Sequence, residues 1–253
     1  MKSIAIVGKG GTGKSAITTL IAKILIEEYD YNLLLIDADP THPHLSHLMD
    51  LVPETSLEDI RNELIQMSIK HQEELDDFSH TIDFEVYNAI EERKKFSLLY
   101  MGNPTAPGCF CPSNMLLRKV IESISKDFDI ILIDCEAGLE QINRKVIQSV
   151  ETILIISDMS IRSLETAHSI KEIAKKFTNY RQLGVILNKI RGNIDLLLKK
   201  MEELDLPLFG TIPEDEMILE FEMNGKPLIH LPSHTELLSE IRPIVQKIVE
   251  LKE

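Results

Sequence analysis

The sequence predicts an α/β fold with a mainly parallel sheet that carries helices on both faces. Short apolar runs of the kind that form strands alternate along the chain with stretches of helical pattern, and this alternation is typical of parallel strands joined by helical crossovers. The runs at 130–133 and 153–156 are apolar at every position. Continuous apolar runs suit central strands that are buried on both faces.

Strands are expected, in chain order, at 3–7, 32–37, 96–102, 129–135, 152–157 and 182–188. Helices are expected near 14–29, 113–126, 140–149, 161–177, 193–204, 214–223 and 234–251. The last helix could also lie on a membrane surface, because its apolar residues recur at helical spacing. The C-terminal stretch 235–253 carries four acids and three basic residues, so packing against the core is the favoured interpretation.

The length of 253 residues predicts a single domain, with an acidic insertion near 54–95. No uncharged apolar run approaches the roughly 18 residues that a membrane span needs. The first strand begins at once, which leaves no room for a signal peptide, and three cysteines cannot form a complete disulfide framework. We therefore expect a soluble protein of the reducing cytoplasm.

The formal net charge is −14, which disfavours nucleic acid and anionic membranes as partners, because both are bound through clusters of Lys and Arg. The charge is unevenly distributed. Residues 1–26 contain lysines but no acid, whereas 54–95 contain twelve acids against five basic residues. The N-terminal part is thus suited to phosphate, and the acidic segment is interpreted as solvated or facing a partner.

The stretch GKGGTGKS at 8–15 follows the first expected strand and opens the first helix, which is the context of a phosphate-binding loop. Its glycines permit backbone conformations in which N–H groups converge on phosphate oxygens at a helix N-terminus. Lys14 would reach the β- and γ-phosphates of ATP, and Ser15 would hold Mg²⁺. The expected nucleotide-binding residues here are Gly8, Gly10, Gly11, Thr12, Gly13, Lys14, Ser15 and Ala16.

A second lysine, Lys9, stands at the start of this loop. The spelling K-G-G-x-G-K followed by Ser or Thr resembles the deviant Walker A loop of P-loop ATPases of the MinD, ParA and nitrogenase iron protein class. In that class the first lysine crosses a nucleotide-sandwich dimer and stabilises charge on phosphates bound by the other subunit. The resemblance implies an ATP-hydrolysing homodimer in which Lys9 and Lys14 are catalytic. The alternative is an exposed lysine that only adds positive potential.

Asp37 and Asp39 stand at the C-terminal end of the second expected strand, where open parallel sheets bind ligands. The resemblance implies that Asp39 is catalytic and orients the attacking water, and that Asp37 lies near the magnesium. The alternative is an Asp-Pro turn that caps the next helix.

A later apolar run, 130–133, is followed by Asp134, which would contact Mg²⁺ through a water molecule. Phosphoryl transfer requires positioning and charge neutralisation, which Lys9, Lys14, Ser15, Asp39 and Asp134 could together supply. The resemblance places Glu136 and Gly138 in the loop called switch II. It also implies that the amide of Asn188 reads the adenine of ATP or ADP, with Lys189 beside it in the same N-K pair.

Cys109 and Cys111 are two residues apart in an expected loop. In an extended segment their side chains point the same way, so one chain offers two thiolates and a dimer offers the four of a tetrahedral site. The alternative is a pair of buried apolar cysteines. Cys135 follows a strand-end acid and is interpreted as a structural residue of the core.

Four separate stretches, GCFCPSNMLLR, IDCEAGLEQINR, SDMSIRSLETAHSI and GTIPEDEMILEFEMNGKPL, resemble the CooC-type accessory ATPases of carbon monoxide dehydrogenase. The resemblance implies a metallochaperone-type ATPase that assists nickel insertion into carbon monoxide dehydrogenase or acetyl-CoA synthase. A cysteine that nitrogenase iron protein has after switch II is absent here, where Gln141 and its neighbours stand. A four-thiolate Zn²⁺ or Ni²⁺ site is therefore favoured over an iron–sulfur cluster.

Three histidines, His42, His44 and His47, follow Asp39 closely. They could be further nickel ligands, but side chains of the switch loop and a helix surface are the favoured interpretation. Two other functions stay open: a positioning or partitioning ATPase of the MinD or ParA type, and an iron–sulfur reductase component that resembles nitrogenase iron protein. The cysteine pair favours the nickel function. A basic amphipathic tail would favour the positioning function, but the sequence has none.

Overall fold

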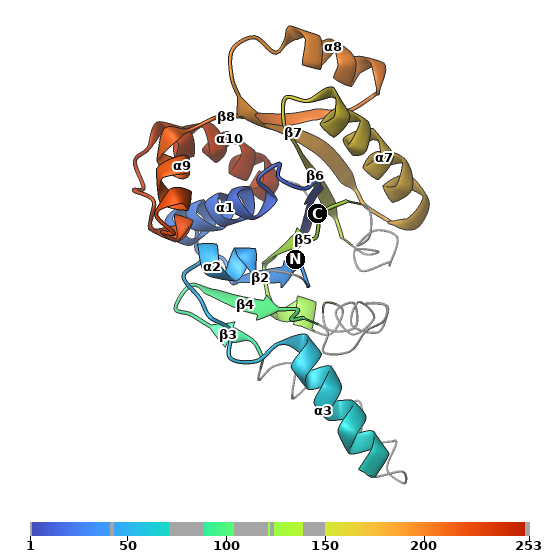
Figure 1. Cartoon of the computed structure of the whole chain (residues 1–253), viewed down its shortest axis with the longest axis vertical. Coiled ribbons are helices and arrows are strands. Elements are labelled where there is room, and N and C mark those ends of the chain that lie inside the picture. Colours follow the sequence, from blue (N-terminus) through green and yellow to red (C-terminus); the bar gives the residue numbers. More distant parts are fainter. Residues whose placement is uncertain are drawn as a thin grey trace.

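A twisted eight-stranded sheet forms the centre of the computed structural model, which describes residues 2–40, 43–70, 89–103, 121, 124–138 and 150–250 (Figure 1). The strands lie in the order β3-β4-β2-β5-β1-β6-β7-β8. Every pairing is parallel except that of β3 with β4. The strands are β1 (Lys2–Gly8), β2 (Leu33–Ala38), β3 (Glu91–Glu92), β4 (Phe96–Tyr100), β5 (Ile130–Cys135), β6 (Thr152–Ser157), β7 (Gln182–Ile190) and β8 (Leu208–Pro213).

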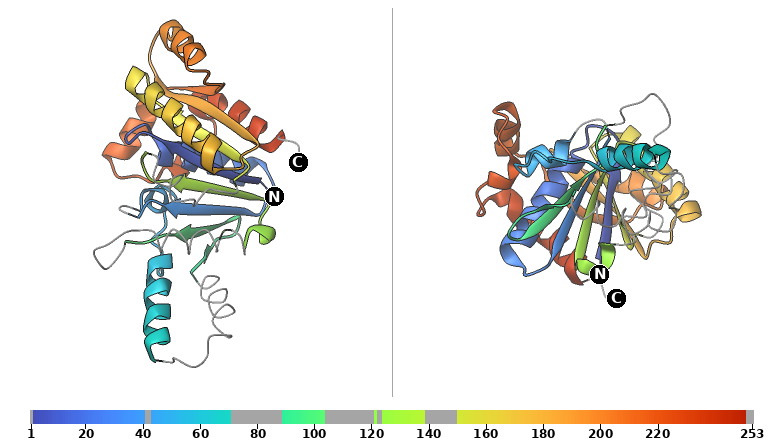
Figure 2. Two further views of the ribbon diagram at one scale, coloured as in Figure 1. Left: turned by 90° about the vertical axis from the view of Figure 1, so that its right-hand side faces the viewer. Right: turned by 90° about the horizontal axis from the view of Figure 1, so that it is seen from below.

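Helices cover both faces of this sheet, as Figure 2 shows. The α-helices of the described residues are α1 (Lys14–Glu28), α2 (His44–Leu48), α3 (Leu57–Lys70), α7 (Ile161–Phe177), α8 (Asp195–Glu203), α9 (Glu216–Met223) and α10 (Glu236–Glu250), with short 3-10 turns η1 (Ser125–Asp127) and η2 (Leu228–His230). The mainly parallel sheet with two helical layers is the fold class that the sequence predicts.

Each face of the sheet has its own apolar core, because alternate residues of a strand point to opposite faces. On β1, Ile4 and Ile6 pack with α1 and α10, whereas Ala5 and Val7 pack with α7 and α8. β5 and β6, whose central runs 130–133 and 153–156 are apolar, are buried along their whole length. Burial on both faces explains why these two strands have no polar alternation.

The six strands expected from the sequence are all present, and two further strands were not expected. β3 has only two residues, too few for a periodic pattern. β8 contains Gly210 and ends at Pro213, residue types that are depleted in strands. Gly210 is required by packing, since a Cβ atom there would stand 2.6 Å from Cγ1 of Ile244 on α10.

Five of the expected helices correspond to α1, α7, α8, α9 and α10, with ends shifted by no more than a few residues. The helix expected at 140–149 lies outside the described residues, as does most of that expected at 113–126. Two helices of the described residues were not expected. α2 is a five-residue helix, and α3 begins inside the acidic segment.

The two ends of the acidic segment belong to the core. Leu57 and Ile60 on α3 are buried, as are Ala89 and Ile90 just before β3. The prediction that the segment is solvated or faces a partner is therefore wrong at these ends, because apolar residues within it reach the sheet. Residues 71–88 lie outside the described part of the chain.

The C-terminal helix α10 packs on the core, which confirms the favoured interpretation of its apolar pattern. Its buried residues are Leu237, Leu238, Ile241, Ile244, Val245 and Ile248. Within the described residues, no helix is long and apolar enough to cross a membrane.

The chain order of the strands reverses at β1. From β1 the chain passes to β2 on one side, and it returns through β5 to β6 on the other side. Ligands of open α/β sheets bind at such a reversal, in the crevice beyond the carboxyl ends of the strands. The loop that follows β1 is the phosphate-loop sequence at 8–15, so the fold places this loop at the expected ligand site.

Candidate nucleotide-binding site

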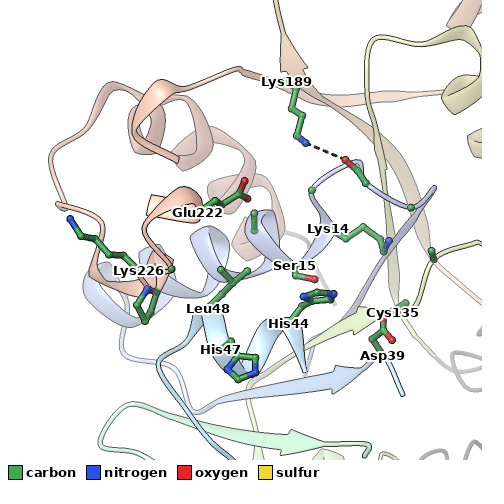
Figure 3. A pocket seen from close by; sticks show the side chains of 17 residues that line it. Lys14, Ser15, Asp39, His44, His47, Leu48, Cys135, Lys189, Glu222 and Lys226 are labelled. Atoms are coloured by element: carbon green, nitrogen blue, oxygen red, sulfur yellow. Dashed lines mark hydrogen bonds between the residues drawn. The ribbon is translucent and has the colours of Figure 1, made fainter. Parts of the chain in front are cut away.

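A cavity of about 630 Å³ opens at the carboxyl ends of β1, β2 and β5 (Figure 3). The phosphate loop and the start of α1 form one wall. Asp39 and residues of α2 form a second wall, and the segment from Glu222 to Pro227 forms a third. This third wall was not expected from the sequence, although its residues belong to the stretch GTIPEDEMILEFEMNGKPL that resembles CooC-type ATPases.

The phosphate loop requires glycine at two of its positions. Gly8 has φ +147° and Gly13 has φ +91°, which side chains with a Cβ rarely adopt. A Cβ on Gly8 would stand 2.3 Å from the carbonyl oxygen of Ile156, and one on Gly13 would stand 2.6 Å from Nδ2 of Asn188. Packing and backbone conformation therefore both exclude larger residues.

Three side chains hold the loop by its carbonyl groups. Thr12 Oγ1 donates to the Lys9 carbonyl at 2.9 Å, Asn188 Nδ2 donates to the Thr12 carbonyl at 2.8 Å, and Lys189 Nζ donates to the Gly11 carbonyl at 3.2 Å. The amide of Asn188 thus supports the phosphate loop in this structure. Its expected contact with adenine stays a prediction.

Helix α1 begins in a way that suits an anion. Its N-cap, Gly13, offers no side chain to the first N–H groups, and the first turn contains no acid. The positive end of the helix dipole is therefore not neutralised from within the helix. Lys14 and Ser15 of this first turn line the cavity (Figure 3), so phosphate would meet a helix N-terminus and a lysine together.

Asp37 and Asp134 are neighbours across two parallel strands, because they are paired in the register of β2 with β5. Both are buried. Asp37 Oδ2 accepts hydrogen bonds from Ser46, from the backbone N at 2.9 Å and from Oγ at 2.8 Å, whereas Asp37 Oδ1 has no hydrogen-bond partner. Burying a carboxylate oxygen that has no partner is energetically costly unless a ligand binds to that oxygen.

Burial raises the pKa of both carboxyls, and each is raised further by negative charge nearby. The pKa of Asp37 rises to about 6, with Asp39 as the nearby charge. The pKa of Asp134 rises to about 7, with Asp37 as the main nearby charge, while a hydrogen bond from Ser15 and the charge of Lys14 act in the opposite direction. The pair therefore favours a proton or a cation.

These residues fit a magnesium ion. Two carboxylates and the hydroxyl of Ser15 are hard oxygen ligands, and Mg²⁺ is held in proteins by one or two carboxylates together with substrate phosphates and water. The described part of the chain contains no group of three or more His, Cys, Asp or Glu that could hold a metal by itself. A site completed by nucleotide phosphate does not need such a group.

Asp39 lines the cavity (Figure 3), whereas Lys9 is not among its lining residues. This placement agrees with the implied role of Lys9 at phosphates bound by the other subunit rather than at those of its own loop. Its contact with a second subunit stays a prediction. The Gly138 N–H donates to the Gly8 carbonyl at 3.0 Å. A backbone hydrogen bond therefore connects the expected switch II segment to the start of the phosphate loop.

Cys109, Cys111 and His42 lie outside the described residues. His44 and His47 are on α2 and line the cavity (Figure 3), which places them beside the nucleotide site.

Cys135 is buried in the core that includes α7. Burial raises the pKa of its thiol far above the ordinary value, so a thiolate is disfavoured there. Its burial agrees with the expected packing in the core, although Cys135 is also among the residues that line the cavity.

Comparison with known proteins agrees with this site. An uncharacterized ATP-binding protein of Methanocaldococcus jannaschii is 34% identical over 254 residues, which cover 98% of this chain and 99% of that protein. The carbon monoxide dehydrogenase accessory protein CooC of Rhodospirillum rubrum is 31% identical over 245 residues, which cover 88% of this chain and 87% of CooC.

Solved structures show the same fold. The cell division ATPase MinD of Pyrococcus furiosus matches with a TM-score of 0.74 at 24% identity over 99% of both chains. MinD of Pyrococcus horikoshii, solved in complex with Mg-ADP, matches with a TM-score of 0.75 at 22% identity over 99% of this chain and 96% of that chain. A family model described as the CobQ/CobB/MinD/ParA nucleotide binding domain matches residues 4–228. The chain therefore belongs to the CobQ/CobB/MinD/ParA family and is a P-loop ATPase.

Proposed function

We propose that this ATPase is a homodimeric accessory protein that assists nickel insertion into carbon monoxide dehydrogenase or acetyl-CoA synthase. The observation that carries the proposal is the 31% identity to CooC over 88% of the chain, combined with the pair Cys109 and Cys111. Two cysteines so spaced serve no step of ATP hydrolysis, and they supply half of a tetrahedral thiolate site.

In the proposed hydrolysis, Lys14 and the N-terminus of α1 bind the β- and γ-phosphates. Ser15, Asp37 and Asp134 would hold Mg²⁺, and the bound ion would supply neutralisation of phosphate charge. Asp39 accepts a hydrogen bond from the attacking water and aligns it with the γ-phosphate. These parts perform the positioning and charge stabilisation that phosphoryl transfer requires.

The proposed dimer brings two nucleotide sites face to face, and Lys9 of one subunit stabilises charge on the phosphates bound by the other. Lys9 is absent from the lining of its own cavity, which supports a role across a subunit interface. A lysine at developing negative charge accelerates phosphoryl transfer by electrostatic stabilisation.

The proposed metal cargo is Ni²⁺ or Zn²⁺, held by Cys109 and Cys111 of both subunits. Thiolates are soft ligands that select such ions over Mg²⁺. Because the same dimer forms both the hydrolysis site and the thiolate site, the bound nucleotide would set the distance between the facing cysteines and hence the metal affinity. This coupling is the proposed gate.

A reconstitution experiment tests the proposed function. Nickel-free carbon monoxide dehydrogenase is incubated with NiCl₂, MgATP and this protein, and carbon monoxide oxidation is measured. We expect activation that requires ATP and that is lost in the variant Asp39→Asn and in the double variant Cys109→Ser, Cys111→Ser. The variant Cys135→Ala is the matched control and should activate normally. Activation that does not depend on the two cysteines would reject a metal-handling role.

The likeness to MinD supports a second candidate, a positioning ATPase that acts at a membrane. Such a protein would bind anionic vesicles in the presence of ATP, which co-sedimentation measures. The net charge of −14 and the packing of α10 into the core argue against it, because membrane-surface binding needs a free amphipathic or basic segment. ATP-dependent vesicle binding would favour this candidate over nickel insertion.

A further inference from the structure

One wall of the nucleotide cavity continues into a short segment, residues 225–230, which we call the strap. Gly225 and Pro227 of the strap line the cavity, as does Glu222 just before it. The strap ends in η2, and η2 packs against α1. The position of this wall therefore depends on what holds the strap to α1.

A buried lysine of α1 makes that connection. Lys23 is only 3% exposed, and its Nζ donates to the carbonyl of Ile229 in η2 at 2.9 Å. Its charge is paired with Glu27 one helical turn later. A buried ammonium group is costly unless it is paired and hydrogen-bonded, and the adjacent core positions of α1 are apolar. An apolar residue at this position would pack in the core without the cost of burying a charge. The presence of lysine there indicates that the bond to the strap is required.

A second tether joins the other side of the strap to the segment after α2. His230 Nε2 lies 2.9 Å from Asp50 Oδ2, and both side chains are more than half exposed. An exposed pair contributes little energy. The buried Lys23 bond is therefore the stronger of these two polar tethers, and it acts beside the packing of Leu228, which is fully buried.

The strap lies at the end of the cavity away from Lys14 and Asp39. Figure 3 shows Lys226 and Glu222 on one side of the cavity and Asp39 and Lys14 on the other, with Ser15 between them. Phosphates bound at the loop and at the start of α1 occupy the side of Lys14. The remaining space, which the strap and Lys189 both line, is available for the ribose and base.

We propose that Lys23 is a positioning residue for the nucleoside of ATP: through the Ile229 carbonyl it holds the strap where it forms the wall of the nucleoside half of the cavity. This inference rests on nucleotide binding by the family and not on the nickel function.

The test compares MgATP with magnesium tripolyphosphate, which carries the phosphates without the nucleoside. Dissociation constants are measured by calorimetry for the parent and for Lys23→Met, which keeps the apolar stem and removes the donor. We expect the Kd of ATP to rise by up to about tenfold, because binding must then order a strap that the lost bond of about 1.5 kcal/mol no longer holds. The Kd of tripolyphosphate should stay within about twofold. The KM for ATP should rise while kcat falls by less than about twofold.

Two further variants control for charge and for stability. Lys175→Met removes an equivalent charge from the exposed Lys175–Glu172 pair on α7 and should leave both affinities unchanged. Lys23→Arg restores a donor and should recover part of the ATP affinity. An unchanged ATP affinity in Lys23→Met, or equal weakening of ATP and tripolyphosphate, would overturn the proposal.

The parent protein offers a measurement that does not depend on the folding of any variant. Hydrogen exchange of amides in the strap should slow in the presence of MgATP and stay unchanged with magnesium tripolyphosphate. Equal protection by both ligands would overturn the proposal.

Discussion

Replacing Asp134 by asparagine should stabilise the ligand-free protein while abolishing ATP hydrolysis. Asp134 is buried beside Asp37, and its pKa is raised from 3.8 to about 7 by burial and by the charge of Asp37. Each pKa unit corresponds to about 1.4 kcal/mol, so ionising Asp134 in the folded state costs roughly 4 kcal/mol relative to the unfolded chain. An asparagine at this position would fill the same space without the charge.

The direction of the pH dependence follows from the raised pKa. Between the unfolded value of 3.8 and the folded value of about 7, the folded state binds more protons than the unfolded state, so the free energy of unfolding falls as the pH rises. The parent therefore loses stability as the pH rises through this window. Asp134→Asn has no carboxyl to ionise at this position, so it does not lose that contribution. The stability difference between variant and parent should grow by roughly 3 kcal/mol between pH 5 and pH 8.

Urea unfolding at the two pH values, without magnesium or nucleotide, measures this difference. Glu165→Gln is the control, since this exposed acid on α7 lies away from the carboxylate pair. If the stability of Asp134→Asn relative to the parent is the same at pH 5 and pH 8, the pKa of Asp134 is not raised by burial and by Asp37, and this explanation is wrong.

Three further substitutions separate the other parts of the site. Asp39→Asn should keep ATP affinity within about twofold, because the phosphate loop is intact, while kcat falls at least about 100-fold in a phosphate-release assay; unimpaired turnover would reject its water-orienting role. Lys9→Ala should bind ATP normally yet fail to form the ATP-dependent dimer in sedimentation, and parent-like dimerisation would leave Lys9 a mere surface charge. Gly13→Ala should weaken ATP at least about tenfold, since a Cβ would meet Asn188 Nδ2 at 2.6 Å; parent-like ATP affinity would contradict the required left-handed turn.

The sequence is sufficient to predict the elements whose signal is local. β5 and β6 are recognisable because burial on both faces favours apolar residues throughout their central runs, 130–133 and 153–156. The phosphate loop is recognisable because its glycines are dictated by backbone conformation and close contacts.

Features that depend on tertiary contacts were not predictable in the same way. β8 is a strand despite Gly210, because that glycine makes room for Ile244 of α10. The Ser46 hydrogen bonds to Asp37 join residues from β2 and an unpredicted short helix. The Lys23 bond joins residues more than two hundred positions apart. No local pattern encodes such pairings.

The most direct test of the central claim is the metal stoichiometry of the purified protein, measured against its molecular mass in solution. The account predicts one Zn²⁺ or Ni²⁺ per two chains, bound in the dimer, lost in the double variant Cys109→Ser, Cys111→Ser and retained in Cys135→Ala. Addition of ATP should change the metal affinity, since both ligands act on the same interface. One metal per chain, or unchanged binding in the double variant, would contradict it.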